Sequence, residues 1–508
     1  MIRSHMRRFR HNAATSLLRH TRLYSQASGK ILDASFTDES TTVTFLHESM
    51  VQPNDSVPTS LDATPDTQDK IRPFTVCFNN IFLRDASKSP KTVDPVSGQR
   101  LVTTAELLDE HNGRRATVPR SVNISEDGKR LVVDWSDGDS FAYDLDFFFK
   151  YKGSSFLTKS IRNQMSKHKR VFWNRDLLNS KIDKNRDGSF FSFDQVMNDD
   201  KLLYRTLVNL QQFGITFISG MPTIRDETDA NDANIYMVRN LCERIGPLRK
   251  TFYGEVFDIT NQNLKDYDQD LPPPHDYNIP FENIASPLHM DLQFLENVPG
   301  FKILHALKNE SENDTNIFVD SLYAARSIRE TDNEAYEALQ HVPINYTFKN
   351  KNKRYYQSKP LVEEYESNEH NTLIGNYEYL VKCVNYSPPF QAPFTYGIYN
   401  KLTNVPKIEG IEDPLTTSPG KVTERLVFRD FLRGLQQFEK MVYDHENQLR
   451  INLPENTAVI YNNRRILHTR TNHNTRQSDL VWFKSCYFDL DTFKSKLKFL
   501  EEAFEKSK

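Results

Sequence analysis

The stretch Leu288–Leu307 reads LHMDLQFLENVPGFKILHAL, and it is the part of the chain that decides both fold and chemistry. Its beginning predicts a strand over residues 287–292. Residues two apart in a strand point to the same face, so His289 and Asp291 are expected to project together. Side by side, an imidazole and a carboxylate can bind one metal ion.

A second imidazole is available far downstream. Residues 464–470 read RRILHTR and follow a predicted strand over 458–461, so only the fold can bring His468 to His289 and Asp291. Two histidines and one carboxylate form the facial triad of non-haem iron(II) oxygenases, which leaves metal positions open for a 2-oxo acid and O₂. The chain has 14 histidines, however, and HxD pairs are common by chance. The spacing alone does not separate a metal site from ordinary core histidines.

The rest of the pattern predicts a mainly β chain with flanking helices. Aromatic residues make up 12% of the chain, a share that suits sheet surfaces. Strands are expected at 75–83, 130–135, 140–143, 215–219, 251–257, 301–307, 317–319, 458–461 and 481–488, and helices at 202–213, 233–245 and 426–443. Many short strands with a few helices favour a double-sheet β barrel (jelly roll) with helices packed outside.

A chain of 508 residues is too long for one ordinary domain. Its first 30 residues are rich in arginine and leucine and contain no acid, which is typical of a mitochondrial transit peptide and points to the matrix. A disordered basic tail is the alternative. The expected parts are a leader at 1–30, a flexible lead-in at 31–70, a small β-rich N-terminal domain at 71–146, a connector at 147–200 and a catalytic domain at 201–500.

Composition excludes several classes of protein. The net charge is −3 and no basic stripe with interleaved aromatics is present, so nucleic acid is not an expected partner. The four cysteines are far apart and form no CxxC pair, which argues against a disulfide framework. No stretch approaches the ~18 apolar residues of a membrane span. A small-molecule substrate is the expected partner.

Four segments resemble the γ-butyrobetaine dioxygenase and trimethyllysine dioxygenase family, a branch of the taurine-dioxygenase-like superfamily. They are residues 81–108, 245–254 (IGPLRKTFYG), 288–307 and 460–491, in the family's order. The resemblance implies a double-stranded β-helix core, a homodimer, and Fe(II), 2-oxoglutarate and O₂ as reactants. It also implies hydroxylation of a trimethylammonium substrate, as in carnitine biosynthesis, with His289, Asp291 and His468 as the iron ligands.

The resemblance further implies an aromatic cage around the trimethylammonium group. The matching positions are Tyr253, Phe257, Phe281 and Tyr487. A quaternary ammonium cannot donate hydrogen bonds, so ring faces are its natural partners, at ~0.5–2 kcal/mol each. Ordinary core aromatics are the alternative interpretation of these four positions.

Two departures from the family pattern matter. The family's N-terminal domain carries zinc on three cysteines and a histidine, whereas the matching positions are Ser87, Ser89, Thr92 and Asp139. Hydroxyl groups are poor zinc ligands, so no structural zinc is expected.

The second departure concerns the co-substrate. The family binds the distal carboxylate of 2-oxoglutarate with an arginine, but the matching position is Val481. A valine cannot pair with a carboxylate. Arg470 and Arg476 lie nearby and are the candidate replacements. Three functions therefore stay open: hydroxylation of γ-butyrobetaine or trimethyllysine, oxygenation of another small acid, or metal binding with weakened or lost turnover.

Overall fold

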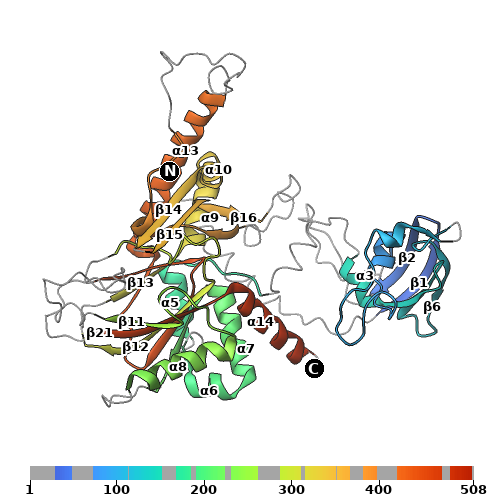
Figure 1. Cartoon of the computed structure of the whole chain (residues 1–508), viewed down its shortest axis with the longest axis horizontal. Coiled ribbons are helices and arrows are strands. Elements are labelled where there is room, and N and C mark those ends of the chain that lie inside the picture. Colours follow the sequence, from blue (N-terminus) through green and yellow to red (C-terminus); the bar gives the residue numbers. More distant parts are fainter. Residues whose placement is uncertain are drawn as a thin grey trace, which may run out of the picture. The chain divides into compact units, whose positions relative to one another are not determined.

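The computed structural model describes residues 29–47, 73–111, 114–151, 168–184, 190–222, 230–260, 286–310, 315–350, 352–365, 381–397, 420–471 and 481–505. The chain divides into two units, Met1–Lys159 and Ser160–Lys508 (Figure 1). Within the described ranges, every helix is too short or too polar to span a lipid bilayer.

The N-terminal unit contains two small antiparallel sheets that share an aromatic core. They are β1 (Gly29–Phe36), β2 (Ser40–His47) and β3 (Phe74–Asn79) in one sheet, and β6 (Pro119–Ile124), β7 (Arg130–Trp135) and β8 (Ser140–Asp144) in the other. Val43 and Phe45 of β2 are fully buried with Trp135. The flexible lead-in expected over 31–70 is therefore wrong for residues 31–47, because alternate side chains of β2 belong to this core.

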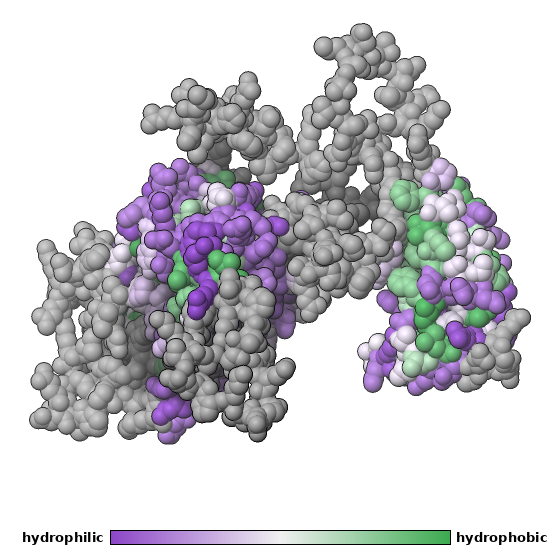
Figure 2. Space-filling model, turned by 90° about the horizontal axis from the view of Figure 1, so that it is seen from above, coloured by the Kyte–Doolittle hydropathy of each residue, from purple (hydrophilic) through white to green (hydrophobic). Residues whose placement is uncertain are grey.

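The strand expected over 75–83 ends earlier, at Asn79. The Asn79 side chain accepts a hydrogen bond from the backbone N–H of Ile81 at 3.1 Å, which caps a short helix, α2 (Asn80–Asp85). The other short elements of the unit are η1 (Glu106–Leu108), β4 (Glu110–His111), β5 (Arg114–Arg115) and α3 (Leu145–Tyr151). Hydrophobic side chains also gather on one face of the unit (Figure 2), and its first sheet leaves Leu32 and Phe74 exposed.

The C-terminal unit is organised around two facing sheets. The larger has the order β11 (Val256–Thr260), β21 (Val481–Phe488), β12 (Phe301–Asn309), β19 (Thr457–Asn462), β10 (Ile215–Ser219) and β9 (Phe190–Ser192). The smaller has the order β18 (Gln448–Ile451), β13 (Thr315–Asp320) and β20 (Ile466–Thr471). Phe318 of β13 packs against Tyr461 of β19 and other apolar side chains of the larger sheet, so one core lies between the two layers.

Helices cover the outer face of the larger sheet (Figure 1). They are α6 (Phe193–Asn198), α7 (Asp200–Phe213), α8 (Ala230–Ile245) and α14 (Leu490–Glu505). The predicted helix over 202–213 ends where Gly214 adopts a φ of +73°, as a glycine after a helix commonly does. A Cβ at position 214 would come within 2.9 Å of the Arg465 side chain, so the close approach also requires glycine.

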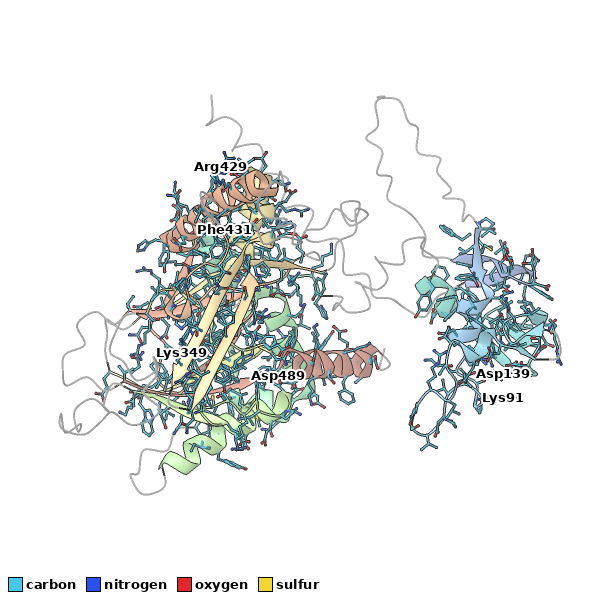
Figure 3. All side chains as sticks on the ribbon, turned by 45° about the horizontal axis from the view of Figure 1, so that its top comes forward. Lys91, Asp139, Lys349, Arg429, Phe431 and Asp489 are labelled. Carbon is cyan, nitrogen blue, oxygen red and sulfur yellow. The ribbon has the colours of Figure 1, made fainter. Side chains whose placement is uncertain are left out.

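A second group of elements packs beside the sheets. It comprises α9 (Ser321–Thr331), α10 (Asn333–His341), α13 (Gly420–Tyr443) and the hairpin of β14 (Pro343–Asn350) and β15 (Lys353–Pro360). Figure 3 labels Phe431 and Arg429 on α13; Phe431 is fully buried, whereas Arg429 is largely exposed. The remaining elements are α5 (Arg175–Lys184), β16 (Val362–Glu364), β17 (Val381–Val384), η5 (Pro388–Phe390) and η6 (His445–Asn447). With this many helices the chain is mixed α/β rather than mainly β.

Candidate metal centre

Three predicted side chains meet between the two sheets. His289, Asp291 and His468 each offer a ligand atom, and these atoms all lie within 4.8 Å of one another. The Nε2 atoms of His289 and His468 are each 3.5 Å from one of the two Asp291 carboxylate oxygens, and the imidazole centroids are 4.6 Å apart. Residues 179 positions apart in the sequence thus form one cluster.

His468 lies on the regular strand β20, whereas an isolated bridge to that strand places His289. His289 and His468 form an isolated antiparallel bridge, with reciprocal backbone hydrogen bonds of 3.1 Å and 3.0 Å. The strand expected over 287–292 is therefore wrong. Pairing stops after one bridge, because Leu292 has a left-handed φ of +58° and the backbone of Asp291 bonds to the Asn463 side chain instead. His289 and Asp291 still reach the same point.

The protonation states suit a metal site. The Nδ1 atom of His289 lies 2.8 Å from the carbonyl oxygen of Pro287, so Nδ1–H donates there and Nε2 presents its lone pair to the cluster. Burial lowers the pKa of His468 well below its usual range, so this imidazole is neutral. Burial alone would raise the pKa of Asp291, but the nearby ammonium of Lys302 is the largest of the causes that hold it well below its usual range. Two imidazoles and one carboxylate are the donor set of a facial-triad iron(II) site.

Two further side chains hold the Asp291 carboxylate. The ammonium of Lys302 lies 2.7 Å from Oδ2, and the Tyr487 hydroxyl donates to the same oxygen at 3.0 Å. Lys302 is 5% exposed. Lys302 was not among the predicted site residues. A lone lysine in the apolar run FKILHAL nevertheless indicates a special role, since lysine is rarely buried without a function or a partner.

A cavity of about 120 Å³ opens beside the triad. Besides the three ligands, its lining includes Tyr253, Phe390, Tyr461, Tyr487, Lys302 and Arg470. The lining thus combines aromatic walls with a few charged groups, which is the usual make-up of a small-molecule site. Phe390 and Tyr461 were not predicted as site residues, because Phe390 stands in no motif and Tyr461 was assigned only to a strand.

The predicted co-substrate residues have different outcomes. Arg470 lines the cavity, with its guanidinium carbon 5.7 Å from the centre of the Phe483 ring. Arg476 lies outside the described residues. Val481 is completely buried in the apolar core between the sheets, and its side chain cannot pair with a carboxylate. Of the two predicted replacements for the family's arginine, Arg470 is thus the one that the structure places on the cavity wall.

The predicted aromatic cage is only partly assembled around the cavity. Tyr253 and Tyr487 line it. Phe257 is stacked between them, with ring centroids 5.1 Å from Tyr253 and 5.6 Å from Tyr487, and it packs into the core as a supporting ring. Phe281 lies outside the described residues. The ammonium of Lys302 already lies 5.7 Å from the centre of the Tyr487 ring.

The four positions that match the family's zinc ligands form a hydrogen-bonded cluster in the N-terminal unit. All four are buried: Ser87, Ser89, Thr92 and Asp139. Figure 3 labels Asp139. Asp139 accepts a hydrogen bond from Ser89 at 2.6 Å and lies 3.1 Å from the guanidinium of Arg84. Arg84, only 2% exposed, also donates to Thr92 and to Asp137, both at 2.7 Å. A protein cation therefore sits among these side chains.

Comparison with known proteins agrees with this geometry. The profile of the family described as "Taurine catabolism dioxygenase TauD, TfdA family" matches residues 179–487. Probable oxidoreductase AIM17 of Saccharomyces cerevisiae is 45% identical over 94% of this chain and 93% of its own length. Gamma-butyrobetaine dioxygenase of Pseudomonas sp. is 24% identical, over 84% of this chain and 90% of its own. Mitochondrial trimethyllysine dioxygenase of Mus musculus is also 24% identical, over 53% and 55%. The chain belongs to the TauD/TfdA family and is a 2-oxoglutarate-dependent non-haem iron dioxygenase.

Proposed function

We propose that this dioxygenase hydroxylates a small organic substrate at the cavity beside His289, Asp291 and His468, with Arg470 as the anchor of 2-oxoglutarate. The observation that carries the proposal is the convergence of the three ligands next to a cavity that also contains Arg470. A guanidinium can pair with a carboxylate through two parallel hydrogen bonds. Arg470 follows His468 by two residues on β20, so it can hold one end of a co-substrate whose other end reaches the metal.

The residues of the cavity have separate tasks in this reaction. A bound iron(II) ion would supply O₂ activation, coupled to conversion of 2-oxoglutarate to succinate and CO₂. His289, Asp291 and His468 would hold that ion. Lys302 and Tyr487 fix the Asp291 carboxylate by hydrogen bonds to Oδ2.

The first candidate substrate is a trimethylammonium compound of the γ-butyrobetaine or trimethyllysine type, with a role like that in carnitine biosynthesis. Two of the four proposed cage rings, Tyr253 and Tyr487, line the cavity. The names of two relatives supply the compounds to try first. A mitochondrial location, a homodimer and the absence of structural zinc remain predictions from the sequence.

The second candidate substrate is another small acid. The described lining favours it, because Lys302 and Arg470 are both cationic and Asp291 is the only carboxylate there. A third candidate, metal binding with weakened turnover, takes its support from Val481, which cannot serve as the co-substrate anchor.

Purified protein reconstituted with Fe(II) without oxygen tests the proposal. After addition of 2-oxoglutarate, O₂ and a panel of betaines and small acids, succinate release should rise with one substrate class and match the hydroxylated product. The variant His468→Ala is the control, because it lacks one metal ligand and should give neither product. Normal Fe(II) binding without 2-oxoglutarate binding would contradict the proposal and support the third candidate.

A further inference from the structure

Lys302 combines three properties that a purely structural lysine would not need. It is 5% exposed, its ammonium contacts the carboxylate of a metal ligand at 2.7 Å, and it lines the cavity. On β12 it lies opposite Tyr461 of β19 and Tyr487 of β21. The three side chains therefore form one row across the floor of the cavity.

Lys302 has hydrogen-bonding capacity beyond its contact with Asp291. A lysine ammonium carries three N–H donors and no acceptor. Within the part of the chain that the structure describes, the side-chain partner seen for Lys302 is Asp291 alone. Since a buried charge is stable only when it is paired and hydrogen-bonded, the remaining donors call for a further acceptor inside the cavity.

The charges of the site favour an anion as that acceptor. Lys302, Arg470 and an iron(II) ion together carry four positive charges, whereas Asp291 and a doubly ionised 2-oxoglutarate carry three negative ones. Among the described lining residues one positive charge therefore remains, since histidines bind a metal ion as neutral imidazoles. A quaternary ammonium would enter a cavity of its own sign, and over the Tyr487 ring it would meet the Lys302 ammonium, 5.7 Å from the ring centre. Like charges in a site with little water repel strongly.

We propose that Lys302 binds an anionic group, a carboxylate in the simplest case, of the primary substrate and that it selects against quaternary ammonium compounds. This inference rests on the proposed dioxygenase function and narrows it to the small-acid candidate. The substrate carboxylate accepts hydrogen bonds from Lys302, and the apolar remainder of the substrate packs on the aromatic wall.

The co-substrate is not the expected partner of Lys302. Arg470 lies over the ring of Phe483, and Lys302 lies over the ring of Tyr487, four residues further along β21. Four residues of a strand span about 13 Å. The two basic groups therefore contact different positions along β21, which favours separate anchors for the co-substrate and the substrate.

Matched ligands test the assignment by binding without turnover. Wild type and the variants Lys302→Gln, Lys302→Arg and Tyr487→Phe are loaded with Fe(II) and 2-oxoglutarate in the absence of O₂. Calorimetry then compares 5,5-dimethylhexanoate, its uncharged amide, and γ-butyrobetaine, which differs from the acid by a quaternary nitrogen in place of a carbon. Wild type should bind the acid about tenfold or more tightly than either other probe, because a charged hydrogen bond is lost or a cation is added.

The variants separate ligand binding from support of Asp291. Lys302→Gln should bind the acid about tenfold or more weakly than wild type does, whereas its affinity for the amide should change little. Lys302→Arg keeps a positive charge and should retain part of the preference for the acid over the amide. Tyr487→Phe removes the other hydrogen bond to Asp291 and keeps the charge, so it should weaken metal binding while preserving the preference for the acid.

Several outcomes would overturn the assignment. They are tighter binding of γ-butyrobetaine than of the acid by wild type, no binding of the acid, or an unchanged affinity for the acid in Lys302→Gln. Loss of 2-oxoglutarate binding in Lys302→Gln without loss of the acid would assign the ammonium to the co-substrate instead. Failure of wild type to bind Fe(II) or 2-oxoglutarate would be a failure of the proposed function itself, and the same titrations detect it.

Discussion

The side-chain amide of Asn463 replaces a strand partner for Asp291. Its Oδ1 accepts the backbone N–H of Asp291 at 2.8 Å, and its Nδ2 donates to the backbone carbonyl of Asp291 at 3.0 Å. The same Nδ2 also donates to the carbonyl of Pro299 at 3.2 Å, and Asn463 is completely buried. Because of this side chain, the backbone can leave the β conformation at Leu292 while the N–H and C=O groups of Asp291 keep hydrogen-bond partners.

Replacement of Asn463 by alanine should therefore damage both the fold and the site. Because three backbone groups in or beside the core lose their hydrogen-bond partner, the free energy of unfolding should fall by about 2–4 kcal/mol. Metal affinity should fall about tenfold or more, since Asp291 is no longer held. Urea unfolding and an anaerobic Fe(II) titration measure the two effects. The exposed Asn452→Ala is the control, and equal effects of both substitutions would contradict this role of Asn463.

His468→Ala should abolish stoichiometric binding of Fe(II), with an affinity at least about 100-fold lower, because one of three protein ligands is removed. Metal analysis after anaerobic loading measures the bound iron. The matched control is His305→Gln, a substitution at a buried histidine of β12 that is outside the triad. Retention of a full equivalent of iron by His468→Ala would be incompatible with the triad.

Arg470→Gln should weaken 2-oxoglutarate binding by about tenfold or more, because a charge-assisted pair with a carboxylate is replaced by a neutral contact. Arg470→Lys keeps the charge but loses the planar guanidinium, so its affinity for 2-oxoglutarate should lie between those of Arg470→Gln and wild type. Calorimetry on the Fe(II)-loaded protein without O₂ gives these affinities. If both variants bind 2-oxoglutarate as wild type does, another basic residue serves as the anchor.

Arg84→Met should destabilise the N-terminal unit by about 3–5 kcal/mol, because it leaves buried Asp139 and the adjacent Asp137 without their cation. The control is Arg100→Met, which breaks the exposed pair with Asp85 in the same unit and should cost less than about 1 kcal/mol. Thermal unfolding compares the two variants. A chelator should leave the unfolding of the N-terminal unit unchanged, and a chelator-dependent shift assigned to this unit would show that the zinc prediction is wrong.

His305 should make stability depend on pH. Burial lowers its pKa to about 4, from an ordinary value near 6.5. Between these values the unfolded chain binds a proton that the folded chain does not, so the free energy of unfolding falls as the pH falls through this range. The loss should reach about 3 kcal/mol near pH 4. Urea unfolding across this range should show a shallower dependence for His305→Gln, whereas parallel curves would rule out this source.

Much of the C-terminal fold follows from local sequence. The strand predicted over 481–488 coincides with β21, and the helices predicted over 202–213 and 233–245 lie within α7 and α8. Each has a clear apolar period, and Gly214 marks an end that its backbone conformation requires. The N-terminal strands β1 and β2 were missed, because their sequences are polar on one face and because the second partner of β2 is a distant strand, β3.

The metal ligands could be predicted because their chemistry is rare as a set and their order matches a family. Their surroundings could not. The role of Asn463 depends on its contact with Asp291, 172 residues away in the sequence, and no local sequence pattern predicts that contact. Phe257 stacks behind Tyr253 and Tyr487 because packing orients ring faces, which spacing in a sequence does not specify. Lys302 was visible as an anomaly in an apolar strand, but only the fold shows that its ammonium reaches Asp291.

The reciprocal backbone hydrogen bonds between His289 and His468 bear on what happens to the enzyme when iron is lost. The main-chain segments that carry the two imidazoles are joined directly by these hydrogen bonds as well as by any shared metal ion. Loss of iron is therefore expected to abolish catalytic activity without unfolding the protein. A cell short of iron would keep a stock of intact protein that regains activity as soon as the supply returns.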